Sequence, residues 1–176
     1  LDLERLGADS DIDRELGADG VVFGCLRPDG SLDTEANAML MEHAKGLSVT
    51  FHRAFDRCAD PRKALEELIA QGFDRILTSG QQPTALEGTP LLKELHEQAN
   101  GRIILLAGCG VNEQNIATIA QATAIHEFHF SARTAVKSKM MFSNPDVYMG
   151  AKDADEDTLN ITSAERVANT IAQLCK

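Results

Sequence analysis

The sequence predicts an α/β protein built on a parallel β-sheet. Short apolar runs alternate with helix-like segments five times along the 176 residues. The expected strands begin near positions 21, 48, 75, 102 and 126, at steps of 27, 27, 27 and 24 residues. Strands that alternate with helices at this pitch are typical of parallel sheets with right-handed crossovers.

The first half of the chain shows the pattern clearly. Residues 1–16 predict a leading helix, and the apolar run 21–25 predicts a strand buried on both faces. Asp33 is a good N-cap for the next helix, and strand 48–53 follows it. Asp60 and Pro61 then open a helix in the order of cap and first-turn proline, and Gly72 ends it.

The second half repeats the pattern and adds an arm. We expect strands at 73–79, 102–107 and 127–131, with helices that start at Thr89 and at the cap Asn112. The segment 137–157 predicts a long polar arm that carries Met140, Met141 and Met149, and a last helix is expected over 162–174. These methionines are either soft metal donors or, as we favour, apolar anchors of the arm against another subunit.

Composition excludes several classes of protein. The net charge of −10 argues against nucleic acid as a partner, because binding phosphates needs a basic face. No apolar run approaches the ~18 residues of a membrane span, and no signal peptide is visible. The four cysteines form no CxxC pair, which argues against a disulfide scaffold or a zinc ribbon.

Two architectures fit the strand–helix rhythm, a doubly wound open sheet and a (β/α)₈ barrel. As a barrel, the chain would hold about five of the eight units, strands 4 to 8. It also begins at Leu1, without an initiator Met, inside what reads as a helix. We therefore expect a fragment or a processed chain that lacks the N-terminal strands.

In either architecture the chemistry lies at the carboxyl ends of the strands. His52, Asp56 and His129 are the candidate catalytic residues there, as acids, bases or their orienters. The alternative for His52 is a hydrogen bond that orients a loop. Asp56 either orients Arg53 or His52 or caps the turn.

A second group of residues predicts an anion site. Gly108 and Gly110 follow an apolar strand and precede a helix, where backbone N–H groups can approach a phosphate. Ser131 and Arg133 lie at the end of the next strand. The alternative is that the glycines only permit a tight turn.

Few side chains of the sequence are candidate soft ligands for a metal ion. Cys25 and Cys109, with His129, are weak candidates for a Cu(I) site, because thiolate and imidazole suit that ion. None of them has diagnostic spacing. A small buried cysteine is the commoner outcome.

Five motifs in this order and spacing resemble the CutC copper homeostasis family, with further similarity in the loop 144–150. They are LGADGVVFG (16–24), VTFHRAFD (49–56), ILTSGQ (76–81), LLAGCGV (105–111) and EFHFSAR (127–133). The resemblance implies a single TIM-barrel domain over residues 1–176, with 137–157 as an arm, in a cytosolic protein that handles copper, Cu(I) especially. The cysteines proposed as copper ligands in that family lie in N-terminal strands that precede this sequence, so no copper ligand carries over.

Three functions therefore compete at this stage. The first is a CutC-like role in copper homeostasis. The second is an enzyme that acts on a small anionic or phosphorylated substrate at the barrel mouth. The third is an interaction module that docks through its arm. Open edges on the first and last strands predict either self-association into a homo-oligomer or an N-terminal part of the protein outside this sequence.

Overall fold

A five-stranded parallel sheet forms the centre of the protein. The computed structural model describes residues 3–142, 144, 146–147, 150, 155 and 157–175. The strands lie side by side in chain order, and each pairs in parallel with the next. They are β1 (Gly20–Phe23), β2 (Ser48–Phe51), β3 (Arg75–Thr78), β4 (Ile104–Gly108) and β5 (Glu127–His129).

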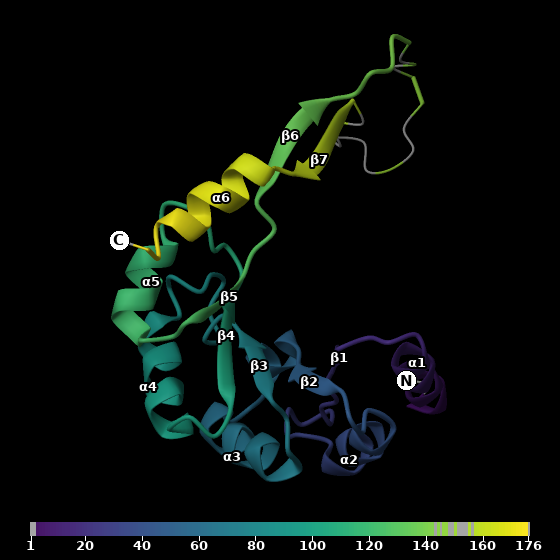
Figure 1. Cartoon of the computed structure of the whole chain (residues 1–176), viewed down its shortest axis with the longest axis vertical. Coiled ribbons are helices and arrows are strands. Elements are labelled where there is room, and N and C mark those ends of the chain that lie inside the picture. Colours follow the sequence, from purple (N-terminus) through teal and green to yellow (C-terminus); the bar gives the residue numbers. More distant parts are fainter. Residues whose placement is uncertain are drawn as a thin grey trace.

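The helices alternate with these strands. They are α1 (Leu3–Glu15), α2 (Thr34–His43), α3 (Pro61–Gln71), α4 (Thr89–Ala99), α5 (Ile116–Thr123) and α6 (Ala164–Ala172), with a 3-10 turn η1 (Arg53–Arg57) after β2. Figure 1 shows α2 to α5 along one side of a curved sheet. A doubly wound sheet reverses its strand order and carries helices on both faces, so that alternative is wrong. The arrangement is a TIM-like α/β fold, and closure into eight units stays a prediction.

Most of the predicted helix signals are confirmed. The Asp33 side chain accepts a hydrogen bond from the backbone N–H of Ala36 at 3.1 Å and caps α2. Asp60 caps α3 in the same way, and Gly72 ends that helix in the left-handed conformation at φ 84°. Each of these residues satisfies backbone groups that a helix end leaves unpaired.

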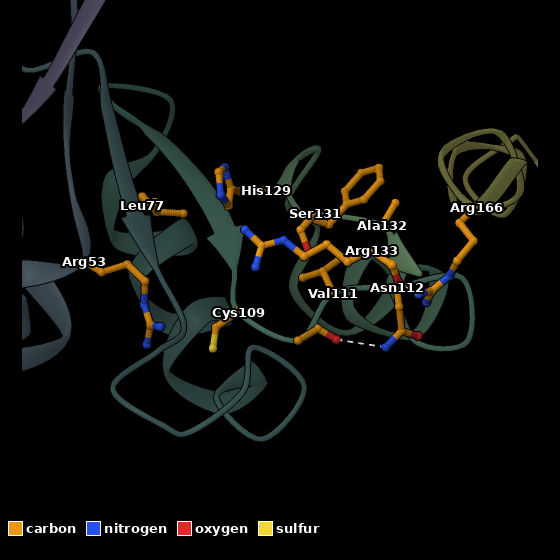
Figure 2. Close-up of a pocket in the computed structure, with 12 residues that line it drawn as sticks. Arg53, Leu77, Cys109, Val111, Asn112, His129, Ser131, Ala132, Arg133 and Arg166 are labelled. Carbon is orange, nitrogen blue, oxygen red and sulfur yellow. Dashed lines mark hydrogen bonds between the residues drawn. The ribbon is translucent and has the colours of Figure 1, made fainter. Parts of the chain in front are cut away.

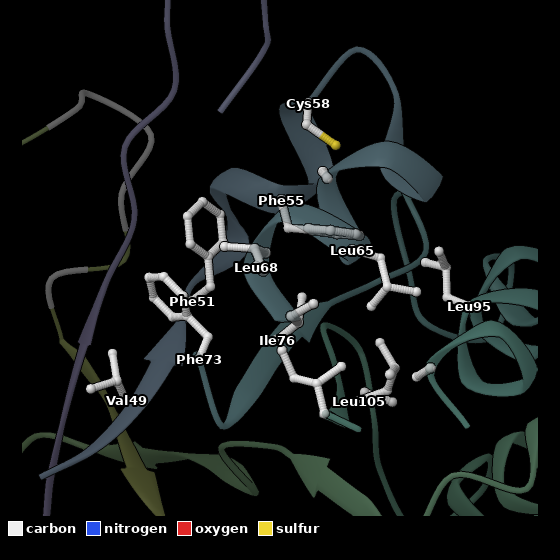
Figure 3. Close-up of a cluster of buried hydrophobic side chains, with 14 of the residues drawn as sticks. Val49, Phe51, Phe55, Cys58, Leu65, Leu68, Phe73, Ile76, Leu95 and Leu105 are labelled. Atoms are coloured by element: carbon white, nitrogen blue, oxygen red, sulfur yellow. The ribbon is translucent and has the colours of Figure 1, made fainter. Parts of the chain in front are cut away.

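The core lies between the sheet and helices α2 to α5, and Figure 3 shows its central part. Phe51 is fully buried, and its ring meets that of Phe73 edge to face at a centroid distance of 5.5 Å. Burial alternates along β1, where Val21 and Phe23 are buried but Val22 is 61% exposed. The prediction that this strand is buried on both faces is therefore wrong, because β1 is an edge strand of a sheet with one well-packed face.

An antiparallel hairpin follows the sheet, and no pattern in the sequence predicted it. Strands β6 (Arg133–Lys137) and β7 (Thr158–Thr162) pair along their whole length and project away from the sheet (Figure 1). The predicted polar arm 137–157 lies between these two strands in the sequence, apart from Lys137, which ends β6. Strand β7 ends at Thr162 and Ser163 caps α6, so α6 begins at Ala164 rather than at 162. Met140 and Met141 are exposed, and Met149 lies outside the described residues.

Two predicted boundaries also shift. Strand β2 ends at Phe51, because His52 Nδ1 accepts a hydrogen bond from the backbone N–H of Ala54 and turns the chain into η1. Helix α5 begins at Ile116 and not directly after Asn112. Asn112 and Asn115 instead hold a loop, since the Asn115 Oδ1 accepts from the Asn112 backbone N–H at 2.9 Å. Within the described part of the chain, no helix has the length and apolar character needed to cross a membrane.

Candidate anion-binding site

A pocket of about 410 Å³ opens at the carboxyl ends of β4 and β5, the edge where both architectures predicted a site. Figure 2 shows it bounded by side chains from five parts of the chain: η1, β3, the loop after β4, the segment from β5 to β6, and α6. The residues that line it are Arg53, Leu77, Cys109, Gly110, Val111, Asn112, His129, Phe130, Ser131, Ala132, Arg133 and Arg166.

The charge of the lining has one sign. It contains three arginines and a histidine, and no Asp or Glu occurs among the described residues that form it. The whole chain has 27 acidic and 17 basic residues, so its surface is acidic on average. A concave site lined only by cationic charge attracts anions, because the field is focused in the cavity.

Arg53 is held by two neighbours. Its Nε donates to Asp56 Oδ2 at 2.7 Å, and its Nη2 donates to Ser79 Oγ at 2.9 Å. Hydrogen bonding to Asp56 raises the pKa of the Arg53 guanidinium. The side chain is thus fixed against the ends of β2 and β3.

Arg166 forms the opposite wall and is also paired. Its Nε and Nη2 each donate to a carboxylate oxygen of Glu113 at 3.0 Å, a bidentate geometry. This contact lowers the pKa of Glu113. Nη1 of Arg166 also donates to the backbone carbonyl of Arg133, so α6 is tied to the start of β6.

Arg133 differs from the other two arginines. Among the described residues, no carboxylate pairs with its guanidinium and no acceptor binds it. In Figure 2 this side chain reaches across the pocket toward His129. Arg133 therefore supplies positive charge to the pocket that no described acidic residue balances.

The backbone of the pocket is strained at two non-glycine residues. Cys109 has φ 82° and Ala132 has φ 45°, in the left-handed region that side chains disfavour. Both line the pocket, one from each side. Strain of this kind is concentrated at functional sites, where the surrounding structure holds it in place.

The predicted anion residues divide into two groups. Gly110, Ser131 and Arg133 line the pocket. The Gly110 carbonyl accepts from the Asn112 side chain at 3.0 Å, the bond drawn dashed in Figure 2. Gly108 does not line the pocket. A Cβ there would lie 2.6 Å from Leu77 Cδ1, so this glycine permits close packing of β3 against β4.

The predicted catalytic residues do not all lie in the pocket. His129 lines the pocket, whereas His52 lies outside its lining and caps η1 through Nδ1. Asp56 has only 8% of its side chain exposed and binds Arg53 rather than His52. Of the two partners considered for Asp56, the structure thus shows Arg53.

Among the described residues, the cysteines do not belong to a cluster of three or more metal ligands. No group of three or more His, Cys, Asp or Glu side chains is placed to hold a metal there. Cys25 is buried, and burial raises the pKa of its thiol. Cys109 lies in the pocket, where its Sγ donates to the Pro83 carbonyl at 3.1 Å. The thiolate is the form that binds metal, and the raised pKa of Cys25 disfavours that form there.

Two arginines of the pocket, Arg53 and Arg166, were not among the predicted ligands. Arg53 stands in the VTFHRAFD motif, where the sequence suggested it only as a possible partner of Asp56. The early end of β2 also brings it to the pocket. Arg166 comes from the last helix, and nothing in the local sequence links it to the sheet.

Comparison with known proteins gives a consistent result. The sequence profile of the CutC family matches residues 1–134. The family protein CutC of Bacteroides thetaiotaomicron is 58% identical over 172 residues, which are 97% of this chain and 69% of that protein. A second one, from Porphyromonas gingivalis, is 48% identical over 97% of this chain and 69% of its own length.

Solved structures agree with the sequence comparison. The structure of a candidate copper homeostasis protein, CutC of Streptococcus agalactiae, superposes with a TM-score of 0.69 at 35% identity. The match covers 72% of this chain, and the chain spans 62% of that protein. A structure described as native KDPGal, at 16% identity and a TM-score of 0.57, shares the fold alone. From its sequence and its fold, the chain belongs to the CutC family.

Proposed function

We propose that this protein binds a small anionic ligand, one that carries a phosphate or carboxylate group, in the pocket at the ends of β4 and β5. The observation that carries the proposal is Arg133, a cation without an acidic partner among the described residues, in a lining that holds no described carboxylate. A volume of about 410 Å³ is in the range of small-molecule sites.

Arginine suits this task chemically. Its planar guanidinium donates two parallel hydrogen bonds to a phosphate or carboxylate. Arg53 and Arg166 each use part of this capacity on a protein carboxylate. Arg133 thus has the most capacity left for a ligand, and we expect it to contribute most to affinity.

Titration with inorganic phosphate, followed by calorimetry or ³¹P NMR, tests the proposal. Removal of a charged hydrogen-bond donor typically costs a factor of roughly 10 to 100 in affinity, so Arg133→Gln should weaken binding by that amount. Arg57→Gln makes the same charge change at an exposed site outside the pocket and should leave binding unchanged. Equal phosphate affinity in the wild type and Arg133→Gln would overturn the proposal.

We propose that His129 is the acid–base group if the bound anion is also a substrate. Of the three candidate catalytic residues, it is the one whose side chain lines the pocket. An imidazole in this position can exchange a proton with a ligand held by Arg133. Turnover of a phosphorylated or carboxylated compound that His129→Gln abolishes, with phosphate affinity retained, would support this role.

A direct role in copper handling is the second candidate. It rests on the name of the relative from Streptococcus agalactiae, at 35% identity, and not on a ligand cluster in this chain. Competition for Cu(I) against a chromogenic chelator tests it. Stoichiometric binding that is lost in a variant with all four cysteines changed to Ser would support thiolate ligation. Failure to compete would remove the candidate for this chain.

A further inference from the structure

We infer that Asp56 is the positioning residue that holds the Arg53 guanidinium at the wall of the anion pocket. The inference rests on the proposed function and assigns a role to a residue that does not itself line the pocket. The contacts of Asp56, its low exposure and the local turn all support it.

Asp56 lies at the centre of a dense hydrogen-bond network. One of its oxygens, Oδ1, accepts from Thr78 Oγ1 at 2.6 Å and from the backbone N–H of Gln81 at 3.1 Å. The other, Oδ2, accepts from Arg53 Nε at 2.7 Å and from Ser79 Oγ at 3.1 Å. The Ser79 backbone N–H lies within 3.1 Å of both oxygens. The carboxylate therefore binds the end of β3 and, at the same time, the side chain of Arg53.

Ser79 completes the arrangement. Its Oγ accepts a hydrogen bond from Nη2 of Arg53 at 2.9 Å, and its single hydroxyl proton is shared between the Gln82 carbonyl oxygen at 2.6 Å and Asp56 Oδ2 at 3.1 Å. Nε and Nη2 of Arg53 are thus fixed by Asp56 and Ser79. Neither of these two residues holds Nη1, and this nitrogen belongs to a side chain that lines the pocket. Two anchors fix the plane of a guanidinium, so the third nitrogen has a defined direction.

The carboxylate is needed for this geometry. Asp56 accepts hydrogen bonds on both oxygens, whereas an asparagine offers one acceptor oxygen and one NH₂ donor. If the NH₂ group of the introduced asparagine took the place of Oδ2, two donors would face each other, the NH₂ group and the N–H of Arg53. If it took the place of Oδ1, it would face the donors that Oδ1 now accepts from, the Thr78 hydroxyl and the Gln81 N–H. Asp56→Asn therefore breaks one half of the network while it preserves the size of the side chain. Pre-organised donors bind a ligand more tightly because less freedom is lost on binding.

A double-mutant cycle on phosphate affinity tests the inference. It compares the wild type, Asp56→Asn, Arg53→Gln and the double variant. We expect Asp56→Asn to weaken phosphate binding by roughly three- to tenfold in the wild-type background and by less than about twofold in the Arg53→Gln background. Asp60→Asn, which changes a carboxylate at the cap of α3, is the matched control and should leave affinity unchanged.

Ser79→Ala provides a second cycle with Arg53→Gln, and it decides the question if Asp56→Asn does not fold. It removes the acceptor of Nη2 but leaves the backbone contacts of Asp56 in place. The same loss of affinity with and without Arg53 would overturn the inference, because Asp56 or Ser79 would then act through general stability. If the wild type does not bind phosphate, the proposed function fails. If Arg133→Gln reduces binding but the cycles show no coupling, only the positioning role fails.

Discussion

At the scale of single residues, close backbone contacts decide what the loops near the pocket tolerate. Gly88, at the start of α4, is the clearest example. A Cβ at this position would lie 1.8 Å from the Ser79 carbonyl oxygen, although its φ of −82° is open to any residue. The contact holds the start of α4 against the loop that follows β3. The requirement for glycine thus comes from the approach of another segment and not from the dihedral angle.

We therefore expect Gly88→Ala to lower the free energy of unfolding by about 3 kcal/mol, the cost of a steric change in a packed site. Gly46→Ala is the comparison, because nothing lies within 4 Å of its added Cβ and only its φ of 91° opposes the change. A side chain held in a left-handed conformation costs less than a steric clash, so the loss there should be about 1 kcal/mol. Urea denaturation of both variants gives the two values, and equal losses would contradict the steric role of Gly88.

At the scale of secondary-structure elements, the ends of the helices are set by local side chains. Helix α3 illustrates this. The Asp60 carboxylate accepts from the backbone N–H groups of Arg62 and Lys63, both at 3.1 Å, and Pro61 occupies the first turn. These contacts satisfy donors that the helix leaves without partners.

Loss of this cap should be measurable. Asp60→Ala is expected to reduce the free energy of unfolding by about 1 kcal/mol, because two backbone donors lose their acceptor. Asp60→Asn keeps an oxygen acceptor at the cap and should remain within a few tenths of a kcal/mol of the wild type. Chemical denaturation measures both. A loss in Asp60→Asn as large as that in Asp60→Ala would show that the charge, and not the cap, matters.

At the scale of the whole molecule, ion pairs connect elements that are far apart in the sequence. Glu66 in α3 accepts two hydrogen bonds from Arg102, at 2.7 and 2.8 Å, and one from Gln98 at 2.9 Å. These contacts lower the pKa of Glu66 from 4.5 to about 2, with Arg102 as the largest cause. They join α3 to α4 and to the segment before β4.

This shift has a defined effect on acid stability. A carboxyl whose pKa is lowered by folding stabilises the native state above its unfolded value and loses that effect as the pH falls through its folded value. Glu66 should therefore contribute to a loss of stability between about pH 4.5 and 2. Glu66→Gln and Arg102→Gln should each flatten the dependence of Tm on pH in that window, and to a similar extent. A profile in Glu66→Gln as steep as that of the wild type would contradict the assignment.

The β6–β7 hairpin has an exposed apolar face. The register of β6 and β7 places Thr134 and Val136 opposite Ile161 and Leu159, so these four residues share one face. Val136, Leu159 and Ile161 are 40%, 55% and 48% exposed. A lone two-stranded ribbon is only marginally stable in water, so this face should be covered in solution.

We propose that a second copy of the chain covers this face, in keeping with the homo-oligomer that the strand edges predict. Leu159→Lys should then reduce the mass of the particle in sedimentation equilibrium, because a charge would be buried in the contact. Asn160→Lys adds the same charge on the other face and should leave the mass unchanged. A wild type that sediments as a monomer would contradict the proposal.

The sequence by itself determined the elements that depend on local chemistry. Strand spacing, caps such as Asp33 and Asp60, and the helix end at Gly72 are all written in neighbouring residues, and the structure reproduces them. The sequence also predicted a site at the strand ends, and Gly110, Ser131, Arg133 and His129 line the pocket that lies there. These residues come together because parallel strands bring their carboxyl ends to a single edge.

Only the tertiary structure decided which charges meet there. Arg53 reaches the pocket because β2 ends at Phe51, and Arg166 reaches it because α6, after the β6–β7 hairpin, pairs with Glu113 in the loop before α5. Asp56 pairs with Arg53 rather than His52 because β3 supplies Thr78 and Ser79 beside it. These contacts join residues that are far apart in the chain. Hydrophobic packing of the sheet and helices determines them, and no local sequence pattern indicates that packing.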